Sequence, residues 1–354
     1  MRSLRHRALT VLLSVFLAPP LASSAEQPSV VILATGGTIA GAAETRTQAG
    51  YSSGQLGVDA LLAAVPGLGE LAELSGEQLS NVGSQDMSDA IWLRLAARVN
   101  ELLARRDVDG VVITHGTDTL EETAYFLNLT VHSRKPVVLT AAMRPATAVS
   151  ADGPLNLYNA VAVAADPEAA GRGVMVVVND DVLGARAFTK THTTDLQTFS
   201  AGEAGLLGAT LYGENRWFRT PWRTHTEESP FSVKGAESLP RVDVLYMTAD
   251  ASADLVNAAV EAGARGLVIA GVGNGNMPAP VLEAVQRAVA EGVVVVRASR
   301  VTGGFVGRNV EVDDDALGTV AAGELNPPRA RVLLKLALRE TRDAARIQTY
   351  FFNH

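Results

Sequence analysis

Cysteine is absent from the 354 residues of this chain, and its absence narrows the chemistry that is open to the protein. Without a thiol the chain forms no disulfide, offers no cysteine ligand to a metal and has no thiolate nucleophile. Any covalent catalysis must therefore use oxygen or nitrogen groups.

Lysine is scarce as well. Only four of the 30 basic residues are lysines, at positions 135, 190, 234 and 335, and the rest are arginines. A position that needs nothing but positive charge is therefore expected to hold arginine here. Because a desolvated lysine can lose its proton and arginine effectively cannot, Lys190 is a candidate for proton transfer, with an ordinary exposed lysine as the alternative.

The N-terminal segment lacks the ~20 consecutive apolar residues that a membrane-spanning helix needs. It combines three arginines, a mostly apolar run over residues 8–18 and small residues at 23–25, which is the pattern of a secretory signal. We expect residues 1–25 to be a cleaved signal peptide, the mature chain to begin at Glu26, and the protein to be exported.

An excess of positive charge is also missing from the mature chain. Removing the signal takes away three arginines and no acidic residue, so the formal net charge changes from −8 to −11. An acidic protein without a basic segment is a poor ligand for nucleic acid or anionic lipid. We expect neither nucleic acid nor a membrane as a partner of the mature form.

Short runs rich in valine and isoleucine alternate with helical stretches along most of the mature sequence. The expected strands are 29–34, 110–114, 136–140, 173–178, 242–247, 267–270 and 293–297. The expected helices are 88–105, with Ser88 as its cap, 120–130, 154–165, 255–262, 280–290 and 329–340. Continuous apolar strands separated by helices predict an α/β fold, in which a parallel sheet has helices on both faces.

The alternation lapses between residues 203 and 240, where glycine, proline and threonine accompany scattered tryptophan and arginine. We interpret 217–240 as an interdomain linker. It separates a larger N-terminal α/β domain, 26–216, from a smaller C-terminal α/β domain, 241–354. Ligands of such sheets bind at the carboxyl ends of the strands, so polar residues there are the candidates for a site.

The first predicted strand runs into A34-T35-G36-G37-T38-I39-A40-G41. Two glycines allow a sharp turn and a close approach of the backbone to a ligand, although a plain strand-to-helix connection would use them equally. The spacing differs from the G-x-G-x-x-G of dinucleotide folds, and no NAD site is predicted. Thr38 stands where the strand emerges, with its hydroxyl expected to point into a cleft.

The second predicted strand runs into I113-T114-H115-G116-T117-D118-T119. Thr119 followed by Glu122 fits a helix capping box, which leaves Thr117 and Asp118 unexplained. Asp118 is either an alternative cap of the following helix or a carboxylate that binds an ammonium group of a substrate.

A third polar cluster is G83-S84-Q85-D86-M87-S88. Ser84, Gln85 and the loop amides suit a carboxylate or amide ligand, while a simple helix entrance is the alternative. His115, His192 and His225 have no second histidine nearby and no cysteine to help, so no metal is predicted. A Ser-His-Asp hydrolase is not indicated either, because G-x-S-x-G is absent.

These motifs together resemble those of bacterial type II (periplasmic) L-asparaginases and glutaminase-asparaginases. The matching segments are A-T-G-G-T-I-A (34–40), G-S-Q-D-M (83–87), I-T-H-G-T-D-T-L-E-E-T-A-Y-F-L (113–127), S-A-D-G-P-L-N-L-Y-N-A (150–160), T-K-T-H-T-T-D (189–195), A-G-V-G-N-G-N (270–276) and L-N-P-P-R-A-R-V-L-L (325–334). The likeness covers essentially the whole mature chain, and the motifs around Thr38 and Thr117 are highly specific.

The resemblance implies catalytic roles residue by residue. Thr38 matches the nucleophilic threonine, and Tyr51, in a loop that closes over the site, matches the activating tyrosine. Thr117 and Lys190 match the second threonine and its lysine partner. Asp118 matches the carboxylate that receives the α-ammonium group of the substrate.

Further residues are implied to bind the substrate. Gly37 belongs to the first turn, and Ser84 and Gln85 match residues that hold the α-carboxylate. Asn276 and Glu311 match residues that reach the site from an adjacent subunit, which implies a homotetramer built as a dimer of intimate dimers. The family also implies a flavodoxin-like larger domain, a periplasmic location and no cofactor.

The implied activity is hydrolysis of the side-chain amide of L-asparagine to L-aspartate and ammonia, with L-glutamine as a secondary substrate. An unactivated amide is a poor electrophile, so the reaction gains from an acyl-enzyme intermediate. Which threonine attacks first, and through which base, stays open. A periplasmic amino-acid-binding protein that uses the same polar groups without turnover is the alternative.

Two departures from the family pattern bear on this expectation. The larger domain often carries a disulfide in the family, and this chain has no cysteine to form it. The segment 302–311 is more similar to the dual glutaminase-asparaginases than to strict asparaginases, and one methylene in a pocket is worth only ~1–3 kcal/mol of selectivity.

Overall fold

The computed structural model describes residues 27–45 and 52–354. The expected signal peptide and Tyr51 lie outside these described residues. Within them, no helix is both long enough and apolar enough to cross a membrane.

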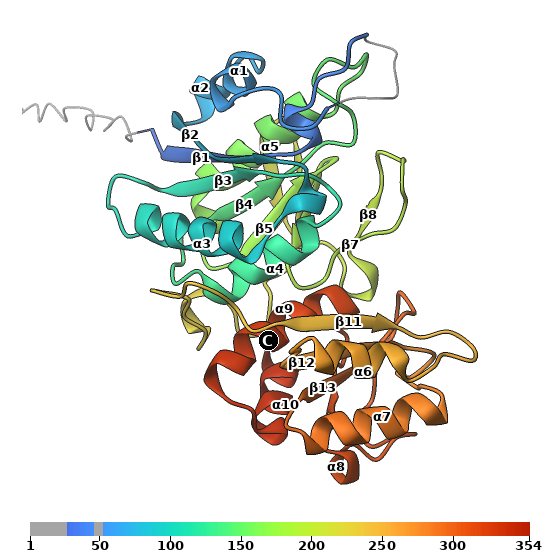
Figure 1. The fold of residues 1–354 in the computed structure, drawn as a ribbon. Helices are drawn as coiled ribbons and strands as arrows, with labels where there is room; N and C mark the ends of the chain where they lie inside the picture. Colours follow the sequence, from blue (N-terminus) through green and yellow to red (C-terminus); the bar gives the residue numbers. More distant parts are fainter. Residues whose placement is uncertain (1–26, 46–51) are drawn as a thin grey trace, which may run out of the picture.

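The N-terminal part is built on an eight-stranded sheet with the order β10-β9-β6-β5-β4-β3-β1-β2 (Figure 1). Its strands are β1 (Ser29–Gly36), β2 (Glu73–Val82), β3 (Gly110–Thr114), β4 (Val137–Thr140), β5 (Val174–Val178), β6 (Asp181–Gly184), β9 (Gly208–Leu211) and β10 (Glu214–Trp217). The first five are parallel in the order 2-1-3-4-5, which is the flavodoxin-like order that the family implied. The last three extend the sheet with antiparallel pairs.

Alternating apolar side chains direct helices to both faces of this sheet. Val31 and Leu33 of β1 face one core, while Val30 and Ile32 face the other. Helices α3 (Asp89–Leu103) and α4 (Leu120–Thr130) cover the first face; α1 (Val58–Ala63), α2 (Leu68–Leu71) and α5 (Gly153–Ala165) cover the second. The predicted double coverage is confirmed, and Ser88 caps α3 by accepting a hydrogen bond from Ile91 N.

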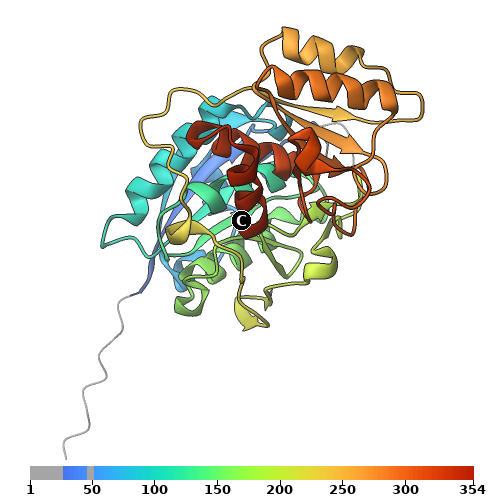
Figure 2. The same cartoon turned by 90° about the horizontal axis from the view of Figure 1, so that it is seen from below.

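The C-terminal part has a four-stranded parallel sheet with the order β11-β12-β13-β14. Its elements are β11 (Val242–Tyr246), α6 (Asp254–Glu261), β12 (Gly266–Gly271), α7 (Ala279–Ala290), β13 (Val294–Ser299), α8 (Asp314–Leu317), β14 (Val320–Ala321), α9 (Pro327–Glu340) and α10 (Ala344–Asn353). Helices α6 and α7 cover the outer face, away from the blue and green N-terminal part in Figure 2.

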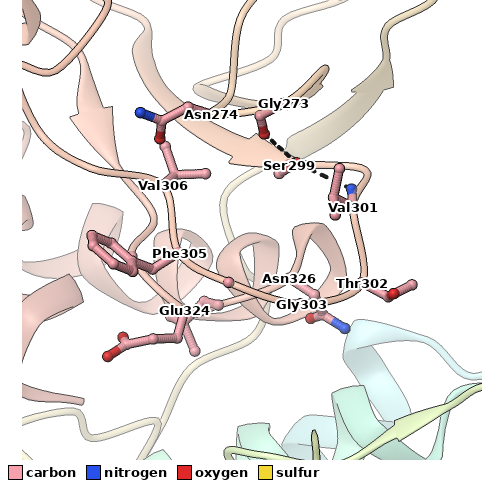
Figure 3. A pocket seen from close by; sticks show the side chains of 13 residues that line it. Gly273, Asn274, Ser299, Val301, Thr302, Gly303, Phe305, Val306, Glu324 and Asn326 are labelled. Atoms are coloured by element: carbon pink, nitrogen blue, oxygen red, sulfur yellow. Dashed lines mark hydrogen bonds between the residues drawn. The ribbon is translucent and has the colours of Figure 1, made fainter. Parts of the chain in front are cut away.

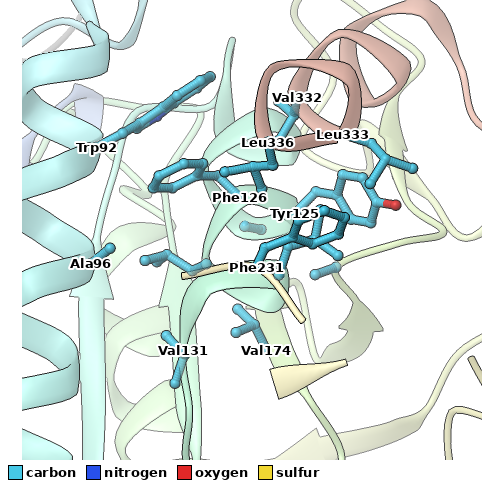
Figure 4. Packing of buried hydrophobic residues seen from close by; sticks show 14 of the residues in the cluster. Trp92, Ala96, Tyr125, Phe126, Val131, Val174, Phe231, Val332, Leu333 and Leu336 are labelled. Atoms are coloured by element: carbon cyan, nitrogen blue, oxygen red, sulfur yellow. The ribbon is translucent and has the colours of Figure 1, made fainter. Parts of the chain in front are cut away.

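The two parts share one hydrophobic core, because α9 packs against the smaller sheet and against α4. Phe126 of α4 is fully buried and stacks on Trp92, and Figure 4 shows Leu336 of α9 approaching it from the other side. Polar pairs join the same helices: Arg329 and Arg331 of α9 meet Glu121 and Glu122 of α4. This packing sets the two sheets in a fixed relation.

Short elements complete the chain, most of them with no apolar signature in the sequence. They are the two-stranded hairpin of β7 (Thr189–Lys190) and β8 (Phe199–Ser200), and the single turns η1 (Thr38–Ala40), η2 (Ser84–Asp86), η3 (Pro167–Ala169), η4 (Gly202–Ala204) and η5 (Thr226–Glu228). Three of these elements, η1, η2 and the hairpin, carry candidate site residues.

Candidate active site

The site lies at the carboxyl ends of β1 and β3, which are neighbours in the sheet. Their register pairs Ala34 with Thr114, so the turns that follow the two strands emerge side by side. The parallel strand order reverses direction here, with β2 on one side of β1 and β3 on the other. Open α/β sheets bind ligands at such a switch point.

Glycine lets the two turns touch. Gly37 has φ of 80°, and a Cβ atom added there would lie 2.4 Å from Gly116 N. No other residue type fits this conformation and this approach. Thr38 and Thr117, one residue beyond each glycine, are both 6% exposed. The close packing of Gly37 and Gly116 therefore brings the two threonines to the same end of the sheet.

Lys190 joins this cluster from far along the chain. Its Nζ donates to Thr117 Oγ1 at 2.9 Å and to Asp118 Oδ1 at 2.7 Å. The lysine side chain is 19% exposed, whereas the carboxylate of Asp118 is 61% exposed. A hydroxyl, an amine and a carboxylate thus form a hydrogen-bonded chain, and a neighbouring base of this kind can activate a hydroxyl as a nucleophile.

The β7–β8 hairpin positions Lys190. At its base Phe188 is fully buried and meets Phe199 edge-on, with ring centroids 5.7 Å apart. Thr191 N donates to Thr198 O at 2.7 Å, which closes the loop. The hairpin is anchored in the core by Phe188 and Phe199, and Lys190 follows Phe188 by two residues.

Ser84 supports the same cluster through the backbone. Its Oγ accepts from Asp118 N at 3.1 Å, and its carbonyl accepts from Thr119 Oγ1 at 2.7 Å. The expected capping box is therefore wrong: Thr119 occupies the N-cap position of α4, but its hydroxyl is engaged by Ser84 O, and Glu122 turns to Arg331. Asp118 does not cap the helix either, because its carboxylate accepts a hydrogen bond from Lys190 Nζ.

Gln85 lies beside Ser84 but points elsewhere. Its side chain is exposed and its Nε2 donates to Asp86 Oδ2 at 3.3 Å. It lines a shallow cavity with Met87 and Ser88, on the α3 side of the loop. Of these two residues, only Ser84 hydrogen-bonds to the segment 117–119 in the described part of the chain.

His115 has a structural role that the sequence did not reveal. It is fully buried, and burial lowers its pKa to about 4, so the ring is neutral near pH 7. Nδ1 lies 2.7 Å from Gly116 O, an acceptor, so Nδ1 carries the proton. Nε2 then accepts from Thr123 Oγ1 at 2.9 Å, and Thr123 in turn accepts from Trp92 Nε1 at 2.8 Å. This chain ties the Gly116 turn to α3 and α4.

No spacing rule could have found the His115 chain, because its members come from three elements. Trp92 stands 31 residues before Thr123. Metal binding is a separate question. Among residues 27–45 and 52–354, no group of three histidine, aspartate or glutamate side chains lies close enough together to hold a metal ion.

Asn276 and Glu311 lie in the C-terminal domain, where Asn276 Nδ2 donates to the Glu311 carboxylate. Asn276 is half-buried and Glu311 is exposed. In the described part of this single chain, neither residue hydrogen-bonds to Thr117, Asp118 or Lys190. Within one chain, the structure therefore shows two separate groups: the residues at the strand ends, and the Asn276–Glu311 pair at the surface of the C-terminal domain.

Comparisons with known proteins cover most of the chain. The family model "Asparaginase, N-terminal" matches residues 29–223, and "Glutaminase/Asparaginase C-terminal domain" matches residues 241–351. The chain is 51% identical to "Probable L-asparaginase periplasmic" of Haemophilus influenzae, over 94% of each chain. It is 51% identical to "L-asparaginase 2" of Escherichia coli, over 92% of each, and 43% identical to "Glutaminase-asparaginase" of Pseudomonas fluorescens biotype A, over 97% of each.

A solved structure gives the same result at the level of the fold. The structure titled "Probable Cytoplasmic L-asparaginase" from Campylobacter jejuni superposes with a TM-score of 0.90 at 46% identity, covering 93% of this chain and 100% of that one. Since family models match both parts of the chain and full-length relatives share about half of its residues, the chain belongs to the asparaginase and glutaminase-asparaginase family.

Proposed function

We propose that this chain hydrolyses the side-chain amide of L-asparagine to L-aspartate and ammonia, and L-glutamine more slowly. The hydrogen-bonded chain of Thr117, Lys190 and Asp118 beside the Thr38 turn carries the proposal. The names of the relatives, which include both L-asparaginases and a glutaminase-asparaginase, support the two substrates.

The proposed chemistry is acyl transfer to a threonine. The Thr38 hydroxyl adds to the amide carbon and passes its proton to a base, for which we propose Tyr51. The tetrahedral intermediate collapses as the amide nitrogen takes this proton back from the base and leaves as ammonia. Water then adds to the ester carbon and gives a proton to the Thr117–Lys190 pair. The second tetrahedral intermediate releases the acid as the Thr38 oxygen takes that proton, which restores the hydroxyl. Backbone amides of the two touching turns supply donors for the oxyanion.

Binding of the amino-acid backbone sets the position of the amide. The exposed carboxylate of Asp118 is proposed to pair with the α-ammonium group, and Ser84 and Gln85 with the α-carboxylate. Gly37, in the turn before Thr38, is proposed to contact the substrate through its backbone. Holding both charged groups restricts the amide to one orientation toward the hydroxyl, which is a large entropic advantage.

We further propose that residues 1–25 direct export to the periplasm and that the mature enzyme is a homotetramer, with domains at 26–216 and 241–354 joined by 217–240. The H. influenzae relative is named as periplasmic, which supports this location, whereas the C. jejuni protein is named as cytoplasmic. N-terminal sequencing of the periplasmic fraction should begin at Glu26. Light scattering during gel filtration should give four times the chain mass.

The decisive experiment measures ammonia release from asparagine and glutamine. Thr38→Ala should fold normally and lose at least about 10³-fold in kcat, because the nucleophile is gone. Lys190→Met should lose about 10²–10⁴-fold, the range of one acid–base group. Lys234→Met, at an exposed lysine, is the matched control and should retain wild-type turnover. Tight binding of asparagine by the wild-type protein without ammonia would favour an amino-acid-binding protein instead.

A further inference from the structure

Two loops of the C-terminal domain carry the residues proposed to reach a neighbouring site. The loop 272–278 follows β12 and contains Asn276, and the loop 300–313 leads from β13 to α8 and contains Glu311. Both side chains lie at the surface and bond to each other. Their position depends on what holds the two loops together underneath.

A direct link between the loops runs through Asn274. Its Oδ1 accepts from Gly307 N at 2.8 Å. Figure 3 shows the Asn274 side chain directed toward the loop at Val306, and Ser299 Oγ donating to Gly273 O at the base of the first loop. The two loops are therefore bound together on one side of the Asn276–Glu311 pair.

Arg297 of β13 lies beneath both loops and is 1% exposed. Its Nη1 donates to Asn274 O at 3.0 Å and to Gly275 O at 3.4 Å, both in the first loop. Its Nη2 donates to Gly307 O at 3.1 Å in the second loop. One guanidinium group thus binds backbone carbonyl groups of both loops.

Asp314 completes the arrangement from the other side. Its two carboxylate oxygens accept from Arg297 Nε and Nη2, each at 2.7 Å, so all five guanidinium donors are used. The carboxylate also accepts from Asn309 N at 3.0 Å and Thr319 Oγ1 at 2.6 Å. Burial raises the pKa of Asp314, but these hydrogen bonds outweigh burial and lower it below the ordinary value.

Stability alone does not account for such a pair. Removing two ions from water opposes their attraction, so apolar residues of similar volume often give equal or greater stability. What apolar residues cannot supply is a rigid fork that fixes three carbonyl groups of two loops. A geometric role is the property that distinguishes this pair from an apolar core.

We propose that the Arg297–Asp314 pair positions Asn276 and Glu311 for the substrate, from beneath the loops and without touching the substrate. The inference rests on the proposed function and on the family resemblance, which implies that Asn276 and Glu311 help to bind the substrate in an adjacent subunit. A positioning residue acts through the groups it holds, so its effect must disappear when those groups are removed.

The test measures kcat and KM for asparagine in Arg297→Lys, Asn276→Ala and the double variant, all as full-length enzyme. Lysine keeps the buried charge but loses the fork. Arg297→Lys should raise KM about tenfold or more and change kcat less than about threefold, because ground-state and transition-state binding weaken together. In the Asn276→Ala background, the same change should alter KM less than about twofold.

Arg98→Lys is the matched control. Arg98 also forms a fork with a carboxylate, that of Glu77, but it joins α3 to β2, far from the two loops. Its KM should stay at the wild-type value. Should Arg297→Lys fail to fold, Asn274→Ala removes the link between the loops without disturbing a buried charge and should raise KM in the same way.

The outcomes separate the inference from the function on which it rests. A raised KM in Asn276→Ala beside an unchanged KM in folded Arg297→Lys, or in folded Asn274→Ala, overturns the inference alone. So does an effect of Arg297→Lys that persists in full in the Asn276→Ala background. Absence of ammonia from the wild-type enzyme overturns the proposed function and the inference together.

Discussion

Replacing Thr123 with valine is expected to destabilise the protein by about 3 kcal/mol, because two buried groups lose their partner at once. The hydroxyl accepts from Trp92 Nε1 and donates to His115 Nε2, and all three side chains are buried. Each unsatisfied buried group costs about 1–3 kcal/mol. Valine has nearly the same shape and a similar helix propensity, so the missing hydroxyl dominates the change.

Thr130→Val provides the control on the same helix. Thr130 is equally buried, but its hydroxyl donates only to Phe126 O, one turn back in α4. The Phe126 carbonyl lies within α4 and keeps its place in the backbone hydrogen bonds of the helix. Loss of the hydroxyl as a second donor should therefore cost less than about 1 kcal/mol. The chemical change is the same in both variants. They differ in the buried polar groups that are left without a hydrogen-bond partner.

The assay is urea unfolding followed by circular dichroism, with the midpoints compared at equal slope. Thr123→Val should unfold at a clearly lower urea concentration than Thr130→Val. Equal midpoints for the two variants would refute the hydrogen-bond chain as a source of stability, whatever their distance from the wild type.

Three further predictions concern the same region. Burial lowers the pKa of His115 from 6.5 to about 4. Between these two pH values the unfolded chain binds a proton at His115 and the folded chain does not, so acid favours unfolding. The free energy of unfolding is therefore unaffected by this group above pH 6.5 and falls by about 3 kcal/mol as the pH is lowered toward 4. His115→Gln should lose that part of the slope in unfolding measured across this range, and an unchanged slope would contradict the assignment. Gly37→Ala places a Cβ against Gly116 N at positive φ, so turnover should fall by about 10²-fold, whereas Gly57→Ala, with open space around its Cβ, should leave ammonia release unaltered. Phe126→Ala opens the shared core and should lower the free energy of unfolding by about 3–5 kcal/mol, and a loss below about 1 kcal/mol in urea titration would show that the two parts do not depend on it.

Local pattern determined the regular parts of the fold. The seven runs of apolar β-branched residues became strands whose ends lie within two residues of the predicted ones, and the predicted helix 120–130 has the same bounds as α4. These elements are buried on one or both faces, so apolar periodicity records their environment directly. Strand β2 escaped prediction because it lies at the sheet edge and alternates half-buried with exposed residues.

The candidate site divides in the same way. Glycine next to threonine at two strand ends was visible in the sequence, because a parallel sheet places all such ends on one edge. Their register, the contact of Gly37 with Gly116, and the turning of Thr119 toward Ser84 rather than its own helix were not visible. A capping motif and a tertiary hydrogen bond use the same residue types, and only the packing decides between them.

Tertiary structure alone decided which distant groups meet. Lys190 reaches Thr117 across 73 residues, and Arg297 reaches Asp314 across 17, and no apolar period predicts either contact. Periodicity reports whether a residue is buried, since burial depends on the residue itself and its near neighbours. A contact between polar side chains depends on the paths of two separate segments, and those paths are set by the whole hydrophobic core.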